Sequence, residues 1–353
     1  MPAVPWRRIV ALAVAATAVG AALVLLNLRA VGQPVAGLLY AGADGPSADV
    51  VVADLGGPLE PGVGHDGQQF YAVARNPLDP HEAAESLERP RYRLQRPGFS
   101  LLAWALHPSG GGEGLVWALF AVGVAGLALG GVALGGLAAR TGGTPLLAAA
   151  FPLLPGSLLC LRLTLADPLA LAFALSALAL DLAGRRRAAV VLGVAAVLTK
   201  ESTLLVLLGW ALARPSDRGR QRLVIVPALA GGALAALLWA VFPGQGLGVG
   251  ELGPPLLGIL ASVPTWAAGD HLTSLCSLLA AVALGVAALR RHGLRSPFGP
   301  AVALQLAFLT LVTDTVWALG SGGLRVTLPA LALGVLALLA APAERPVPAL
   351  VAA

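Results

Sequence analysis

The chain has 353 residues, of which 57% are hydrophobic and only 12% are charged. Ordinary soluble domains carry about 25% charged residues, so this composition excludes them and predicts an all-α, polytopic membrane protein. The net charge of +5 does not indicate nucleic acid binding, because the arginines lie in short clusters beside apolar runs, where they orient a membrane protein. Cys160 and Cys276 lie in apolar segments and form no recognisable disulfide framework.

The first apolar run, residues 9–26, follows Arg7 and Arg8. At about 18 residues it can span a bilayer. We expect a retained span with the N-terminus in the cytoplasm. A cleaved signal peptide is the alternative, but its apolar core would usually be shorter and would end at a small-residue cleavage site.

Residues 27–114 form the one long polar segment and hold 10 of the 18 acidic residues. We expect a small extracytoplasmic subdomain with surface helices, inserted into a single membrane domain that covers residues 1–353. Within it, Asp79, Pro80 and Glu82 are typical of a helix start, and that helix must stop near Pro90. The apolar residues 99–106 are too few to span a membrane.

The remaining chain contains further candidate spans, at residues 115–139, 145–161, 169–183, 223–242, 272–289, 301–319 and 324–341. Residues 188–213 are apolar with a polar centre at 199–203. As one span they would place the arginines of residues 214–222 outside, against the positive-inside rule. We therefore favour a re-entrant pair of half-length helices over a single span. This gives about eight full spans plus the re-entrant pair, with both termini in the cytoplasm.

The densest group of chemically useful side chains lies in the polar segment and comprises His65, Asp66, Gln68 and Tyr71. Asp66 is a candidate general base. It could equally be the N-cap of a helix that begins near Gly67, and the two roles are compatible because capping fixes the carboxylate. His65 is an ordinary polar neighbour in the simpler interpretation, and one His beside one Asp has no diagnostic metal-site spacing.

Charged residues in apolar surroundings form a second group of candidates. Lys200 and Glu201 lie where ionisable residues are costly and therefore indicate function; a mutually neutralised pair at the hairpin turn is the alternative. Arg325 opens the last span on its outer side, where its fork of donors could hold a phosphate or reach the lipid interface. Asp167 precedes Pro168 at the outer end of a span, where an N-cap is the simpler interpretation.

Arg93 and Arg96 are further candidates for substrate contact, and anchors to lipid headgroups are the alternative. With them, the sequence supplies short motifs in four regions of the chain. These are Asp66-Gly67-Gln68-Gln69-Phe70-Tyr71 with Asn76-Pro77, Tyr92-Arg93 to Pro97, Leu198-Thr199-Lys200-Glu201, and Arg325 to Pro329.

The layout of a first span, a long extracytoplasmic loop with an acidic residue, surface helices and many further spans resembles the GT-C superfamily of membrane glycosyltransferases. The first motif is similar to the Asp-Gly-Gln-x-aromatic-Tyr motif of bacterial membrane proteins linked to cell-surface glycopolymers, and the other three resemble its companion motifs. Gln69 and Ala72 depart from the aromatic and basic residues of that pattern, which weakens an argument for sugar stacking there.

The resemblance implies transfer of a sugar from a polyprenyl-phosphate donor to a hydroxyl of a glycan or lipid acceptor, at the extracytoplasmic face of the inner (plasma) membrane, for cell-envelope glycan or glycopolymer. Asp66 would be the catalytic base of one inverting displacement, and Arg325, with Lys200 or Arg96, would stabilise the departing phosphate. The implied substrate-binding residues are His65, Gln68, Tyr71, Arg93, Arg96, Asp167, Lys200, Glu201 and Arg325.

Partners other than membrane lipids and these substrates are not indicated. No metal ligands are assigned, but a divalent metal stays open because some GT-C enzymes use one and others do not. Two alternative functions also stay open: a transporter or flippase of lipid-linked sugar, and a non-catalytic membrane scaffold of envelope assembly. A transporter would distribute functional charges through the spans, whereas here they gather at the expected outer face.

Overall fold

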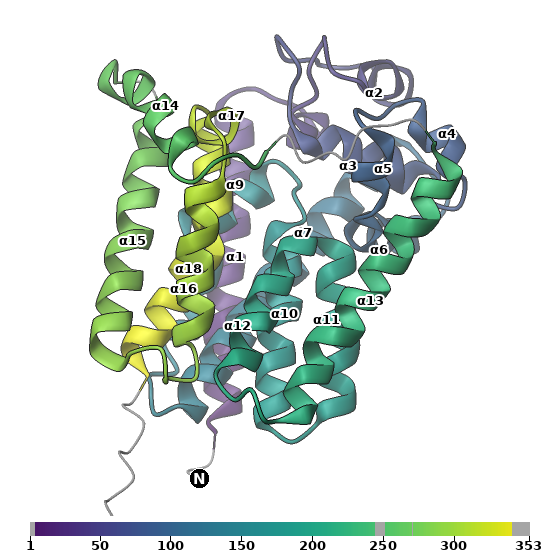
Figure 1. The fold of residues 1–353 in the computed structure, drawn as a ribbon. Coiled ribbons are helices and arrows are strands. Elements are labelled where there is room, and N and C mark those ends of the chain that lie inside the picture. The colour runs from purple at the N-terminus through teal and green to yellow at the C-terminus, as the bar shows by residue number, and fades with distance from the viewer. Residues whose placement is uncertain (1–3, 244–250, 270, 341–353) are drawn as a thin grey trace, which may run out of the picture.

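The computed structural model describes residues 4–243, 251–269 and 271–340, and these residues form a bundle of helices without a β-strand (Figure 1). Five of the described helices are long and apolar enough to cross a membrane. They are α1 (Trp6–Ala30), α7 (Gly112–Arg140), α13 (Arg218–Val241), α15 (Leu272–His292) and α18 (Gly320–Leu339). This is the architecture of a helical membrane protein, as the composition predicts.

Three of the expected spans are shorter than a full crossing. Residues 145–161 form two helices, α8 (Leu147–Leu153) and α9 (Pro155–Arg162), because Leu154 precedes a proline and leaves the helical region. The other two are α10 (Asp167–Leu182) and α16 (Gly299–Leu311). A 16-residue helix such as α10 is about 24 Å long, less than the ~30 Å hydrocarbon layer. The count of eight full spans therefore stays a prediction.

The chain doubles back within residues 188–213, at the polar centre of the stretch. α11 (Arg186–Thr199) ends at Lys200, a short 3₁₀ turn, η2 (Glu201–Thr203), follows, and α12 (Leu204–Leu212) returns (Figure 1). Both ends of this hairpin lie together, since Arg186 contacts Asp217 at the start of α13 at 2.9 Å. The structure thus has the hairpin geometry that we predicted, and its position in a bilayer stays a prediction.

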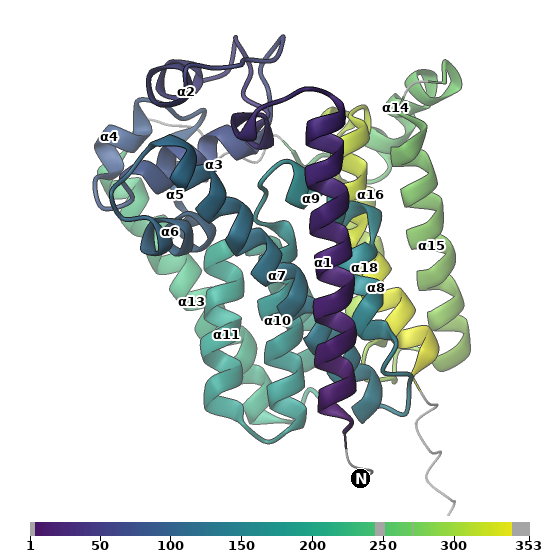
Figure 2. The same ribbon diagram turned by 180° about the vertical axis from the view of Figure 1, so that it is seen from behind.

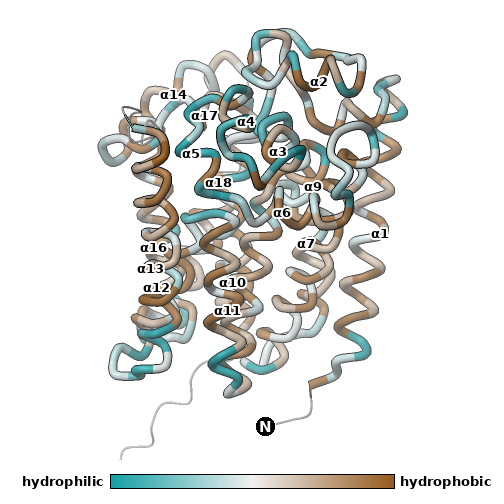
Figure 3. Tube along the Cα trace, turned by 90° about the vertical axis from the view of Figure 1, so that its right-hand side faces the viewer, coloured by the Kyte–Doolittle hydropathy of each residue, from teal (hydrophilic) through white to brown (hydrophobic). Residues whose placement is uncertain are grey.

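The polar subdomain lies at one end of the bundle, as Figures 1 and 2 show from opposite sides, and the chain enters from the other end through α1. Hydrophilic segments gather at both ends, with apolar helices between them (Figure 3). Past the subdomain, α14 (Leu257–Ala267) and α17 (Asp314–Trp317) also lie at its end of the bundle (Figure 1).

The subdomain consists of short helices. They are η1 (Val35–Leu39), α2 (Ala48–Leu55), α3 (Asp66–Arg75), α4 (Pro80–Ala84), α5 (Pro90–Leu94) and α6 (Pro97–Leu106). The predicted helix start is confirmed, because the Asp79 carboxylate accepts from the backbone N–H groups of His81 and Glu82 at 3.0 and 3.1 Å. α3, however, is not a surface helix: residues 67–74 are all buried, and Phe70 packs edge-on against Phe99 of α6.

Two glycines permit the close packing that brings the candidate site together. A Cβ atom at Gly67 would lie 2.7 Å from the carbonyl oxygen of Leu39 and closer still to that of Leu163. A Cβ at Gly156 would likewise collide with the carbonyl oxygen of Leu324. Because only glycine allows such approach, the start of α3 lies against the segment before α10, and α9 lies against α18.

Candidate functional site

The structure joins residues from four distant parts of the sequence into one line of ion pairs. Arg325 Nη2 donates to Asp66 Oδ2 at 2.9 Å and to Asp167 Oδ2 at 3.2 Å. The other oxygen of Asp66 lies 2.9 Å from Arg93 Nη1, and the other oxygen of Asp167 accepts from Lys200 Nζ. Three cations therefore hold two carboxylates, and we call these five residues the charged cluster.

Neither carboxylate of the charged cluster is a helix N-cap. Asp66 is the first residue of α3, and His65 occupies the cap position without a side-chain capping bond. Asp167 is the first residue of α10, after Ala166. The N-cap interpretation of both residues is therefore wrong, and their oxygens are available to the cations. The positive ends of the two helix dipoles add a further stabilisation of about 0.3–1 kcal/mol for each carboxylate.

The charged cluster is largely removed from solvent. The exposed fraction of the side chain is 7% for Asp167 and 10% for Arg93. Burial by itself would raise the pKa of the Asp66 carboxyl, but Arg325 and Arg93 outweigh it and hold that pKa well below its usual range. Asp66 is therefore ionised, and with both oxygens engaged it is a weak proton acceptor in this arrangement.

The two arginines of the charged cluster also retain unused donors. The Nε atoms of Arg93 and Arg325 are buried and have no hydrogen-bond partner among the described residues. Buried polar groups are nearly always paired, and guanidinium groups bond most strongly to anionic oxygens. Arg93 Nη2 also contacts the carboxylate of Glu88 at 3.3 Å, so the cations are matched in number by carboxylates. The two unused N–H groups nevertheless give the cluster the chemistry of an anion-binding site.

A second set of polar contacts lies beside the cluster. Arg96 Nε donates to Glu201 Oε2 at 2.6 Å and Arg96 Nη2 donates to the hydroxyl of Tyr92. The Tyr92 hydroxyl in turn donates to Glu251 Oε2 at 2.9 Å. Lys200 and Glu201 thus do not neutralise each other, as one interpretation of the sequence had it, because each pairs with a different partner. The Tyr92–Glu251 contact joins residues 159 positions apart, and no local sequence pattern predicts it.

His65 borders the charged cluster on the side of α18. Its Nε2 lies 3.4 Å from the hydroxyl of Ser321, one turn before Arg325. Its ring packs edge-on against Tyr40, with ring centroids 5.1 Å apart. Burial and the positive charge of Arg325 lower the pKa of His65, against an opposing effect of Asp66.

The structure does not bring Gln68 and Tyr71 to the charged cluster. Gln68 Nε2 donates to the carbonyl oxygen of Val63 at 2.7 Å and so holds the loop before α3. The fully buried Tyr71 donates to Asp54 at 2.9 Å, and Arg75 contacts the same carboxylate at 3.0 Å. In this arrangement both residues stabilise the subdomain, and their substrate contacts stay a prediction.

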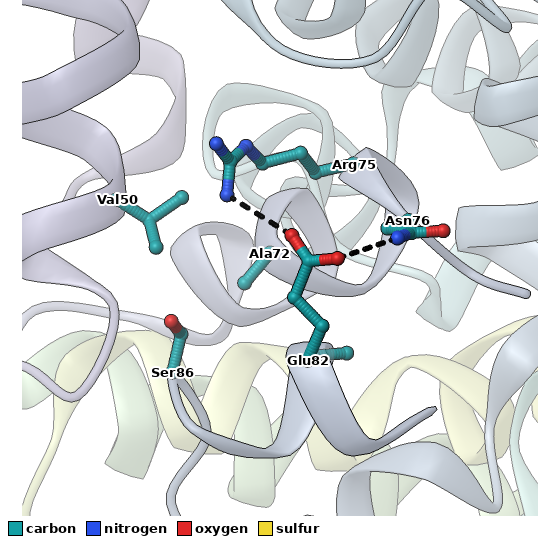
Figure 4. A pocket seen from close by; sticks show the side chains of 7 residues that line it. Val50, Ala72, Arg75, Asn76, Glu82 and Ser86 are labelled. Carbon is teal, nitrogen blue, oxygen red and sulfur yellow. Dashed lines mark hydrogen bonds and ion pairs between the residues drawn. The ribbon is translucent and has the colours of Figure 1, made fainter. Parts of the chain in front are cut away.

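A shallow polar pocket lies at the opposite end of α3 from Asp66 (Figure 4). Glu82 lies 3.7 Å from Arg75 Nη1 and accepts from Asn76 Nδ2 at 2.6 Å. Since α3 has ten residues, its ends are about 14 Å apart. This pocket is therefore separate from the charged cluster.

The charged cluster does not have the donors of a metal site. Asp66 and Asp167 are its two carboxylates, and each is already held by two cationic side chains. Within the described part of the chain, no three His, Cys, Asp or Glu residues are grouped so that they could hold a metal ion. The residues present therefore fit an anionic ligand better than a divalent cation.

In comparisons with known proteins, the chain matches no family model, no curated protein and no solved structure.

Proposed function

We propose that the protein is a GT-C-like glycosyltransferase that moves a sugar from a polyprenyl-phosphate donor to an acceptor hydroxyl. The observation that carries the proposal is the charged cluster, which gathers three cations and leaves the buried Nε atoms of Arg93 and Arg325 unpaired. It lies at the polar end of an otherwise apolar bundle. A lipid-linked phosphate matches both the charged cluster and the apolar helices, because it offers an anion to the cluster and an apolar chain to the membrane.

The chemistry of such a transfer suits the cations of the cluster. As the bond from the anomeric carbon to the phosphate breaks, negative charge develops on the phosphate oxygens. Arg325, Arg93 and Lys200 are held in place by the two carboxylates and would stabilise that charge where it develops. Asp66 was predicted as the base, and this role stays a prediction. Its observed contacts support a role in holding the two arginines for the phosphate.

We further propose that the chain crosses the inner (plasma) membrane eight times, with the re-entrant pair in addition and both termini in the cytoplasm. Basic residues support this topology: Arg140, Arg186 and Arg290 lie near the helix ends farthest from the subdomain. The positive-inside rule assigns that end to the cytoplasm. The subdomain of residues 27–114 and the charged cluster would then face the extracytoplasmic side, where a cell-envelope glycan or glycopolymer is built.

Binding of a polyprenyl phosphate to the purified protein tests the proposal. Arg325→Gln removes charge-assisted hydrogen bonds of about 1.5–3 kcal/mol and should weaken binding about 10- to 100-fold. The matched control is Arg75→Gln, which removes an arginine of α3 that contacts Asp54 and Glu82 outside the cluster. It should leave the affinity unchanged.

Equal binding by wild type and Arg325→Gln would contradict the proposal. Counterflow of labelled lipid-linked sugar in proteoliposomes without transfer would instead establish a transporter. Stoichiometric co-purification of a partner protein, with the Arg325 variant fully functional in cells, would establish a scaffold.

A further inference from the structure

His65 lies at the entrance to α3, and several contacts fix its position. Its backbone N–H donates to the carbonyl oxygen of Tyr40 at 3.0 Å, and its ring packs against the Tyr40 ring. Its Nε2 faces the hydroxyl of Ser321 at 3.4 Å, in the first turn of α18. That contact is long for a hydrogen bond, so another hydroxyl could replace Ser321 at the ring nitrogen at little cost.

The protonation state of His65 suits proton acceptance. Burial and Arg325 lower its pKa from the ordinary value, and the positive end of the α18 dipole acts in the same direction. The charged and titratable groups that face the ring are Asp66 on α3, Tyr40 on the preceding loop and Arg325 on α18. The imidazole is therefore neutral at pH 7 and carries one nitrogen lone pair.

Asp66 is the weaker candidate for this task. Arg93 and Arg325 each occupy one of its oxygens at 2.9 Å. A carboxylate held by two guanidinium groups has little tendency to take a proton. His65 and Asp66 are consecutive in the chain, yet their surroundings give them different chemistry.

The geometry of α18 relates the imidazole to the expected phosphate position. Ser321 and Arg325 are four residues apart and therefore share one face, separated by about 6 Å along the helix axis. In inverting glycosyl transfer the base and the leaving group lie on opposite sides of the anomeric carbon; inverting glycosidases, with a water in between, space their two carboxyl groups by about 6.5–9.5 Å. Because Ser321 and Arg325 leave α18 on the same face, a phosphate at Arg325 and a hydroxyl at His65 would be neighbours.

We infer that His65 is the general base of the transfer, an inference that rests on the proposed function. The acceptor hydroxyl gives its proton to the imidazole, and its oxygen forms a bond to the anomeric carbon. The bond from that carbon to the phosphate oxygen breaks, and its electron pair stays on the phosphate, which Arg325 and Arg93 hold. The imidazolium, stabilised by neighbouring Asp66, then releases the proton to water. Asp66 is a positioning residue for the two arginines.

The pH dependence of kcat/KM tests this assignment on the unmodified protein. A base must be unprotonated, so with His65 as base the rate falls about tenfold per pH unit below an apparent pKa under the ordinary histidine value of about 6.5. With Asp66 as base the rate stays flat to about pH 5, because the pKa of Asp66 is held well below its usual range.

Substitution provides the second arm of the experiment. His65→Ala should lower the rate about 10²- to 10⁴-fold, and added imidazole should restore part of it, which a merely structural residue would not show. His81→Ala is the matched control, because His81 is exposed on α4 and contacts Phe242. It should retain the wild-type rate.

Two results would overturn the assignment: a rate that shows no decline with falling pH down to the point where the protein unfolds, or a His65→Ala rate within about threefold of wild type. If His65→Ala does not fold, the pH profile of the unmodified protein decides the question. Absence of transfer by the wild-type protein at every pH would overturn the proposed function itself, so the two failures are distinguishable.

Discussion

Asp66→Asn should increase the affinity of the protein for a phosphate ligand. In the structure Asp66 occupies one donor group of Arg93 and one of Arg325. A bound phosphate must share or take over these donors and must also lie close to a negative charge. The substitution removes that charge while an amide of the same size remains.

The size of the effect follows from the local geometry. At an effective dielectric constant of about 20, two unit charges about 5 Å apart interact by about 3 kcal/mol. The Asp66 side chain is 20% exposed, so solvent screens part of this repulsion. We expect a gain of about 1.5–3 kcal/mol, or binding about 10- to 100-fold tighter.

The assay is isothermal titration of the detergent-purified protein with a short-chain polyprenyl phosphate, with inorganic phosphate to separate the headgroup from the chain. Asp54→Asn is the matched control, since Asp54 contacts Tyr71 and Arg75 away from the charged cluster, and its affinity should equal that of wild type. If Asp66→Asn binds with wild-type affinity or more weakly while remaining folded, the phosphate does not compete with Asp66 for the arginines.

Three further predictions concern stability, measured by thermal unfolding in detergent. Gly67→Ala should destabilise the protein by about 1–3 kcal/mol, because its Cβ would collide with two backbone carbonyls; Gly232→Ala in α13, with open space around it, should be neutral or stabilising. Arg220→Met should cost about 3–5 kcal/mol, since it leaves Asp181 buried without its 3.2 Å partner, and adding Asp181→Asn should restore part of the loss. The pKa of Asp66 is lowered in the folded protein, so the ionised carboxylate contributes fully to stability above about pH 4 and less as the pH falls further. In Asp66→Asn, stability should therefore decline less steeply with falling pH.

Each stability prediction has a result that contradicts it. Wild-type stability of Gly67→Ala would mean that α3 can move away from the segment before α10. An Arg220→Met protein as stable as wild type would mean that Asp181 is satisfied by Trp210, which donates to it at 2.8 Å. If the stability of Asp66→Asn declines with falling pH as steeply as that of wild type, other carboxyl groups cause the loss of stability in acid.

Much of the fold could be predicted from hydropathy, because long apolar runs have few structures open to them in lipid. The hairpin at Lys200 was also predictable, since polar residues in the middle of an apolar stretch have to face protein or water. The burial of α3 was not. We expected surface helices in this segment, whereas Gly67 lets α3 pack closely against Leu39 and Leu163, a contact that no local pattern encodes.

The candidate site was predictable in its residue types and not in its pairings. In the sequence, Asp167, Lys200 and Arg325 are charges at the ends or in the middle of apolar runs, and Asp66 belongs to a polar motif. The structure brings all four together. Which cation holds which carboxylate depends on contacts across 27 to 259 residues. Glu251 does not lie in an apolar run, so the sequence did not single it out as a candidate site residue. Gln68 and Tyr71 belonged to the same motif as Asp66, but they lie on other faces of α3 and contact the subdomain.

The central claim is that the charged cluster binds the phosphate of a lipid-linked donor. A structure of the full chain with a short-chain polyprenyl phosphate tests it most directly. We expect the phosphate within hydrogen-bond distance of Arg93 and Arg325, with its chain leading toward the apolar helices. A phosphate bound elsewhere, with the Arg325 contacts to Asp66 and Asp167 intact, would contradict the account.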